Sequence, residues 1–131
     1  YMLHDLTRWA ARLGVPFQFS ASFPHNSLMA MRALTAAGED ERVALSHAIF
    51  RAAWVENRNI SDPKVLADVL GDRAEALLAA TSDPAVKAEL MKTTQEAIDA
   101  GSFGAPTFLV NGELHFGNDR LDFALEAALR S

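Results

Sequence analysis

The sequence Pro106-Thr107-Phe108-Leu109-Val110-Asn111-Gly112-Glu113-Leu114-His115-Phe116 decides the fold class of this 131-residue chain. Asn-Gly is the dipeptide that most favours a two-residue turn, because both of its positions tolerate positive φ. It stands between two short runs of residues that favour strands. The stretch therefore predicts a β-hairpin.

Helical periodicity dominates the rest of the chain. Leu3, Leu6, Trp9 and Leu13 recur every three or four residues, and Gly14 follows as a helix end. Similar spacing predicts helices over residues 26–37, 39–58, 84–100 and 117–130. Residues 15–23 alternate in the manner of a strand or an extended linker.

Two short motifs predict where helices begin. Ser61-Asp62-Pro63 and Ser82-Asp83-Pro84 each place a side-chain oxygen before a proline. The oxygen can accept the free N–H groups of a first helical turn, and proline fits that turn without losing a hydrogen bond. Because a two-stranded sheet is unstable alone, we expect the hairpin to need further strands, from an upstream segment, a partner chain or a further domain.

Composition excludes several classes of function. The 12 Lys and Arg residues are outnumbered by 17 Asp and Glu, and there is no cysteine. The chain itself can therefore hold no disulfide, thiolate metal site or cysteine nucleophile, and its net charge of −5 argues against nucleic-acid binding. The histidines lack metal-ligand spacing, so we expect no metal site. Neither a long apolar run nor a signal peptide is seen, so we expect a cytoplasmic protein that does not bind membranes.

Ala105-Pro106 lies at the start of the predicted hairpin. A cis peptide bond there would turn the Ala105 backbone outward, which would leave its N–H and C=O free for a peptide-like ligand. The alternative is an ordinary trans proline at a strand edge, which is the commoner state of X–Pro bonds.

A second candidate follows the hairpin at Phe116-Gly117-Asn118-Asp119, where a strand passes through a glycine into a helix. Backbone N–H groups and a carboxylate at one junction suit a zwitterion. The alternative is that Asn118 or Asp119 only caps the helix.

Large side chains on two predicted helices allow a third site. Phe50 and Trp54 on one helix, with Met29 and Met31 on another, could wall a pocket for an aromatic substrate. Residues at helical spacing also fit simple core packing.

The chain resembles one family along almost its whole length. Gly101 to Val110 (GSFGAPTFLV) and His115 to Asp122 (HFGNDRLD) look like the 2-hydroxychromene-2-carboxylate isomerases, which group with kappa-class glutathione transferases in the DsbA-like branch of the thioredoxin superfamily. Further segments resemble the same proteins in the same order: Tyr1 to Leu6, Phe23 to Arg32, Phe50 to Trp54 and Lys92 to Ala97.

The resemblance implies an α/β thioredoxin-like fold of DsbA and kappa type, with an all-helical domain inserted into it. Residues 1–101 would be the helical insertion, and residues 102–131 the C-terminal half of the thioredoxin-like domain. The family's first strand, first helix and second strand would precede Tyr1, so this chain is expected to be mostly helical with one hairpin.

The resemblance also implies a function. Such an enzyme isomerises 2-hydroxychromene-2-carboxylate, a small aromatic carboxylate, through a transient glutathione adduct, usually as a homodimer. The implied glutathione contacts are Ala105, Pro106, Phe116, Gly117, Asn118 and Asp119, and we expect His25, Asn26 and Trp54 to face the substrate.

One expected residue has no counterpart. The family's serine, which activates the thiol of glutathione, would lie upstream of Tyr1. A kappa-like transferase, a relative of the DsbA-like thiol oxidoreductases and a non-catalytic helical fragment that binds a partner remain alternatives.

Overall fold

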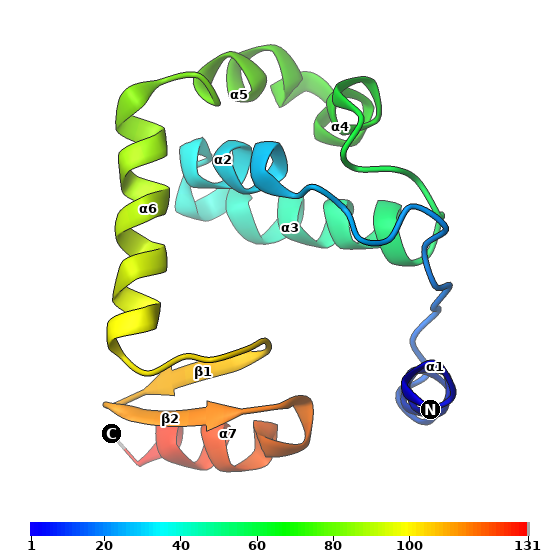
Figure 1. Ribbon diagram of the computed structural model, residues 1–131, viewed down its shortest axis with the longest axis vertical. Coiled ribbons are helices and arrows are strands. Elements are labelled where there is room, and N and C mark those ends of the chain that lie inside the picture. The colour runs from blue at the N-terminus through cyan, green and yellow to red at the C-terminus, as the bar shows by residue number, and fades with distance from the viewer. Residues whose placement is uncertain (131) are drawn as a thin grey trace. The chain divides into compact units, whose positions relative to one another are not determined.

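The computed structural model describes residues 1–130 (Figure 1). Contacts divide the chain into two compact units, the first from Tyr1 to Leu90 and the second beginning at Met91. The predicted domain boundary after residue 101 stays a prediction. The helices are α1 (Met2–Leu13), α2 (Leu28–Ala36), α3 (Glu39–Trp54), α4 (Pro63–Leu70), α5 (Ala74–Ala80), α6 (Pro84–Asp99) and α7 (Leu121–Leu129), the strands are β1 (Thr107–Val110) and β2 (Glu113–Phe116), and short 3₁₀ turns cover Gly71–Arg73 and Asn118–Arg120.

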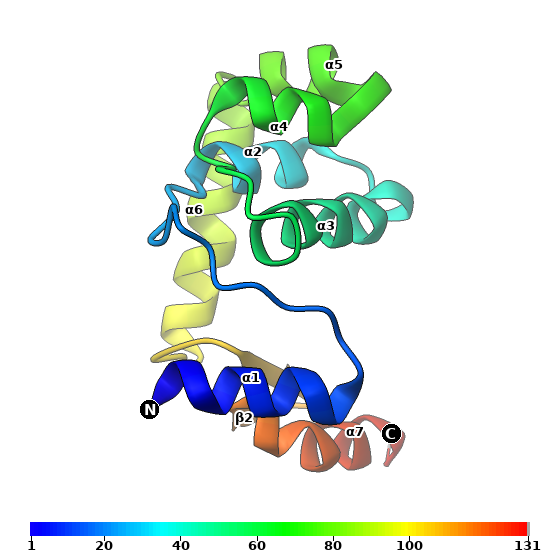
Figure 2. The same cartoon turned by 90° about the vertical axis from the view of Figure 1, so that its right-hand side faces the viewer.

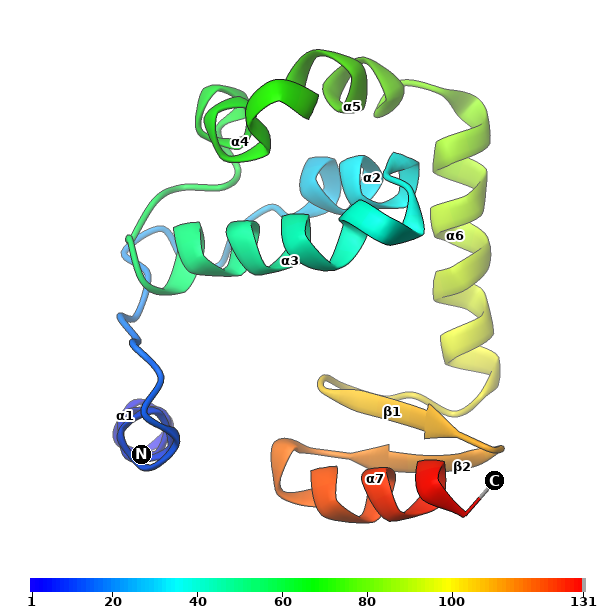
Figure 3. The same ribbon diagram turned by 180° about the vertical axis from the view of Figure 1, so that it is seen from behind.

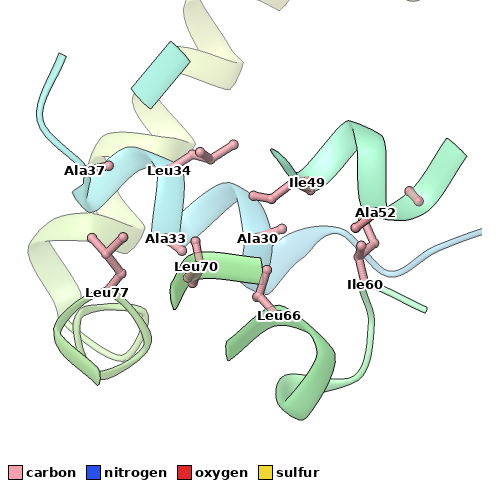
Figure 4. Close-up of a cluster of buried hydrophobic side chains, with 11 residues drawn as sticks. Ala30, Ala33, Leu34, Ala37, Ile49, Ala52, Ile60, Leu66, Leu70 and Leu77 are labelled. Carbon is pink, nitrogen blue, oxygen red and sulfur yellow. The ribbon is translucent and has the colours of Figure 1, made fainter. Parts of the chain in front are cut away.

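The core of the first unit lies among α2, α3, α4 and α5. Helices α4 and α5 lie along one side of the α2 and α3 pair (Figures 1 and 2). Alanine fills much of this core, which lets helix backbones approach closely. Figure 4 shows side chains from the four helices and one loop pointing toward one another; the buried cluster is Ala30, Ala33, Leu34, Ala37, Ile49, Ala52, Ala53, Ile60, Leu66, Leu70 and Leu77.

The predicted helix boundaries are confirmed where local chemistry sets them. Gly14 ends α1 in the left-handed conformation, with φ 64°. Asp62 Oδ1 accepts a hydrogen bond from the Lys64 N–H at 2.8 Å, and Asp83 Oδ1 accepts one from the Ala85 N–H at 2.8 Å. Both motifs therefore cap helices whose first residue is proline.

Residues 15–23 form an extended linker, and of the two predicted alternatives the strand does not occur. The Gln18 N–H donates to the Trp54 carbonyl at 2.6 Å, and the Ala21 N–H donates to Asn57 Oδ1 at 2.8 Å. The linker is thus held by single bonds to the end of α3 and the loop after it, with no strand partner.

The large apolar residues of α3 do not mark its buried face, and the predicted end of this helix is wrong. Val43 and Phe50 are 65% and 64% exposed, whereas Ile49, Ala52 and Ala53 are buried. The helix also ends at Trp54 and not at residue 58. The face of α3 that packs against α2 and α4 carries mostly small residues. The spacing of large apolar residues in the sequence does not identify this face.

The hairpin of the second unit forms as predicted. Thr107 pairs with Phe116 and Val110 with Glu113 in an antiparallel register. Both turn residues, Asn111 and Gly112, have positive φ of 50° and 82°. Helix α7 packs against both strands (Figure 3), and its Ala124 and Ala127 are buried.

Candidate functional site

The two glycine-flanked loops of the second unit are joined by one hydrogen bond. The Gly117 N–H donates to the Pro106 carbonyl at 2.9 Å, just beyond the last residue pair of the hairpin. The Ala105–Pro106 peptide bond is cis. Ala105 is exposed, and its N–H and C=O make no hydrogen bond with any residue from 1 to 130. The structure therefore offers one free donor and one free acceptor beside the Gly117 loop.

Phe116 supports the loop that carries Ala105. A β-carbon added to Gly104 would lie 2.9 Å from Cε2 of Phe116, so only glycine leaves room for that ring. The Phe103 and Phe116 rings lie 4.6 Å apart at 44°. Thr107 Oγ1 closes the loop by donating to the Gly104 carbonyl at 2.5 Å. Phe103 is not among the residues predicted for this site, although it directly precedes Gly104.

Asp119 folds back over Gly117. Gly117 has φ 101°, and the 3₁₀ turn Asn118–Arg120 follows it. No side-chain capping bond is made at the start of this turn or of α7, so the capping alternative for Asn118 and Asp119 does not occur. Asp119 Oδ2 instead lies 3.0 Å from Nη1 of Arg120. Both side chains are more than half exposed, so this ion pair is weak and a ligand can compete for it.

His25 and Trp54 line one cavity in the first unit. The cavity has a volume of about 310 Å³ and an almost wholly apolar wall that includes Phe23, Met31 and Phe50. His25 meets the Trp54 ring edge-on, with centroids 5.9 Å apart and planes at 89°. Both ring nitrogens of His25 are buried and have no hydrogen-bond partner among residues 1–130. They are therefore the polar groups of this cavity that most need a ligand.

Trp54 packs against the linker and also forms part of the cavity wall. Its ring stacks on Phe17 at 6.2 Å and meets Phe19 edge-on at 5.8 Å. These contacts hold the linker against the end of α3. The two interpretations of Trp54 from sequence are thus compatible.

Asn26 lies apart from this cavity. Its Oδ1 accepts a hydrogen bond from the Leu28 N–H at 3.2 Å, and its own N–H donates to Ser61 Oγ at 2.8 Å. It lines a second hollow, together with Arg32. Arg32 was missed as a candidate, although it is the one charged residue in the sequence of α2.

The described residues contain neither a candidate metal site nor a candidate membrane-spanning helix. Residues 1–130 contain no group of three or more His, Cys, Asp or Glu side chains arranged to hold a metal ion. Over the same residues, every helix is too short or too polar to span a bilayer.

Comparisons with known proteins point to one group. Over 125 residues the chain is 36% identical to a 2-hydroxychromene-2-carboxylate isomerase of Sphingobium xenophagum, an alignment that covers 93% of this chain and 64% of that protein. It is 31% identical to human glutathione S-transferase kappa 1, covering 93% of this chain and 62% of that one. The solved structure of a selenomethionine 2-hydroxychromene-2-carboxylate isomerase superposes with a TM-score of 0.82 at 32% identity, over 99% of this chain.

The chain spans somewhat less than two thirds of these proteins, since the alignment covers 64% of the solved structure. The observed architecture, mostly helical with one small antiparallel sheet, matches that part of the DsbA-like thioredoxin fold. A model of the DSBA-like thioredoxin domain matches residues 1–129, and the chain belongs to that family.

Proposed function

We propose that this protein is a glutathione-dependent isomerase of the 2-hydroxychromene-2-carboxylate type. The observation that carries the proposal is the free Ala105 backbone next to Pro106, whose carbonyl accepts a hydrogen bond from Gly117, the residue over which the Asp119 carboxylate folds. Relatives named as such isomerases in three bacteria support the choice of reaction.

The residues present fit a tripeptide such as glutathione. An extended peptide needs one donor and one acceptor to pair with a chain beside it, and Ala105 has both free. Pro106 fixes the loop, and Phe116 packs beneath it against Gly104. We assign the cysteinyl part of glutathione to Ala105.

The γ-glutamyl end of glutathione carries an ammonium and a carboxylate, and the Gly117 loop has groups for both. Among residues 1–130, Asp119 Oδ2 pairs only with the exposed Arg120, so an ammonium can replace that partner. The Asn118 side chain is exposed and makes no hydrogen bond within the described residues, so it is free to bind the carboxylate.

We assign the aromatic substrate to the cavity of His25 and Trp54. Its apolar wall suits a planar ring, and the buried His25 nitrogens can donate to one oxygen of the ligand or accept from its hydroxyl. Asn26, expected at the substrate, lines the other hollow, and we assign it to positioning the start of α2.

Glutathione, when bound, supplies the thiol sulfur of the reaction, which this cysteine-free chain cannot provide. Ala105 and Asp119 then orient the tripeptide, and the cavity excludes water from the ring of the substrate. The serine expected upstream of Tyr1 stays a prediction, and the chain by itself has no assigned catalytic residue.

Calorimetry on the full-length protein tests the glutathione site. Asp119→Ala should weaken glutathione binding about tenfold or more, because a charge-assisted contact is lost. N-acetylcysteinylglycine lacks the γ-glutamyl ammonium, so its affinity should be the same for both proteins. Asp122→Ala, which removes an exposed carboxylate nearby, is the matched control. Equal glutathione affinity in wild type and Asp119→Ala would overturn the assignment.

A kappa-type transferase is the second candidate, favoured by the likeness to human glutathione S-transferase kappa 1. The two reactions differ in what happens to glutathione. An isomerase converts many equivalents of substrate at a catalytic amount of glutathione, whereas a transferase consumes one glutathione for each product. Counting free thiol during turnover separates them.

We further propose a cytoplasmic homodimer. Exposed apolar residues on α1 and α7, such as Leu13, Phe123 and Leu129, are surfaces that a second copy could cover. Sedimentation of the full-length protein tests the dimer, and cell fractionation tests the compartment.

A further inference from the structure

A second hollow lies on the other side of α2 from the aromatic cavity. Met29 and Arg32 line this hollow, whereas Ala30, Met31 and Leu34 line the cavity. Its volume is about 270 Å³, and its wall also includes the loop before α4 and the end of α5. The hollow is small for an organic cofactor and ample for a small ion with its water.

Arg32 is the charged group of this hollow. It makes no ion pair or hydrogen bond with residues 1–130, and its Nε is buried without a partner. The arginines of α3 and of the segments up to α5 all have partners: Arg42 donates to the carbonyls of Leu34 and Ala37, and Arg51, Arg58 and Arg73 pair with carboxylates. The Nε–H of Arg32 is shielded from water without an acceptor, and no carboxylate among residues 1–130 balances the charge of the half-buried side chain, so Arg32 is poised for an anion.

The polar neighbours of Arg32 present hydrogen-bond donors. Ser61 Oγ accepts from the Asn26 N–H, and Asn26 Oδ1 accepts from the Leu28 N–H, so their acceptor atoms are in use. The Ser61 hydroxyl and the Asn26 NH₂ group are left to donate. The Ser82 hydroxyl has no partner among the described residues.

The other polar groups near the hollow do not change its preference for a ligand that accepts hydrogen bonds. The hydroxyl of Thr81 donates to the Leu78 carbonyl at 2.7 Å and is not available to a ligand. Asp62 and Asp83 stand next to the two serines in sequence, but each caps a helix and neither lines the hollow.

We propose that this hollow binds a small oxyanion, a phosphate or a carboxylate group. Arg32 supplies the charge, and Asn26, Ser61 and Ser82 supply further donors. The hollow shares no lining residue with the aromatic cavity and none with the residues assigned to glutathione, so it stands or falls independently of the proposed function.

Titrating the isotope-labelled full-length protein with inorganic phosphate at constant ionic strength tests the site. The amide signals of Asn26, Arg32 and Ser82 should shift together and saturate. A parallel titration with acetate distinguishes the two ligand classes: saturation by phosphate alone identifies a phosphate site, and saturation by acetate at the same residues identifies a carboxylate site.

Variants decide whether Arg32 carries the binding. Arg32→Met should weaken it about tenfold or more, Ser82→Ala should weaken it by a smaller factor, and Arg32→Lys should retain part of it. Arg8→Met removes an exposed arginine of α1 and should leave it unchanged. If Arg32→Met does not fold, Ser82→Ala and Arg32→Lys still test the site. The proposal would be overturned if neither phosphate nor acetate saturates the shifts. It would also be overturned if no variant weakens the binding.

Discussion

A β-carbon on Gly117 would lie 2.5 Å from Oδ1 of Asp119. Real atoms do not approach so closely without bonding, so the position of the Asp119 carboxylate depends on the missing side chain of Gly117. The φ of 101° at Gly117 adds a second reason for glycine, because other residues rarely adopt it.

Gly117→Ala should therefore displace Asp119 and weaken glutathione binding to about the level of Asp119→Ala. It should also lower the free energy of unfolding by about 1–2 kcal/mol, from the strained φ. Calorimetric affinity and chemical denaturation measure the two effects separately.

Gly14→Ala is the matched control for strain. Gly14 also has positive φ, 64°, but nothing lies within 4 Å of its added β-carbon. It should lose stability without losing glutathione affinity. Loss of affinity in both variants would show that strain, and not the contact with Asp119, explains the effect.

Gly104→Ala should destabilise the second unit through one contact. The new β-carbon would lie 2.9 Å from the Phe116 ring, and overpacking of this kind costs about 1–3 kcal/mol. Phe116→Leu removes the ring that the new β-carbon would meet. The double variant should therefore lose less free energy of unfolding than the two single variants lose together. Additive free energies from denaturation would contradict a direct contact.

Local chemistry explains which parts of the fold the sequence predicts. Asn111-Gly112 determines the hairpin turn by itself, and Asp62 and Asp83 cap helices whose first residues follow them directly. Each of these features depends on atoms a few residues apart. The two loops predicted to bind glutathione also come together, because that same hairpin brings Pro106 and Gly117 side by side.

Long-range packing explains what the sequence does not predict. The buried face of α3 uses Ala52 and Ala53, which no apolar pattern distinguishes from surface alanines. The hollow around Arg32 is completed by Ser61 and Ser82, from loops far along the chain. Such a hollow has no local signature beyond one charge in an apolar helix.

The ion pair of Glu41 and Arg73 predicts a pH dependence of stability. Two hydrogen bonds of 2.8 and 2.9 Å join them, and the hydrogen bond from Arg73 holds the pKa of Glu41 below its ordinary value of 4.5. A lowered pKa stabilises the fold above pH 4.5, and this contribution is lost as the pH falls through the lower folded value.

Glu41→Gln should therefore melt slightly below wild type at neutral pH, by a small margin because the pair is exposed. The difference should close when both are melted at a pH below the folded pKa of Glu41. Glu39→Gln removes a neighbouring carboxylate of the same first turn and serves as the control for the helix dipole. A difference that stays constant with pH would exclude titration of Glu41 as its source.

His25→Phe should separate stability from substrate binding. The buried His25 nitrogens have no partner among the described residues, so removing them relieves an unsatisfied polar group while the ring against Trp54 is kept. We expect the free energy of unfolding to rise by about 1 kcal/mol. The KM for an aromatic carboxylate should rise as well, because the cavity loses its buried polar group.

His47→Phe replaces an exposed histidine of α3 and should change neither the free energy of unfolding nor the KM. A stability gain with unchanged KM would place the substrate outside this cavity, and a stability loss would mean that His25 has a structural partner.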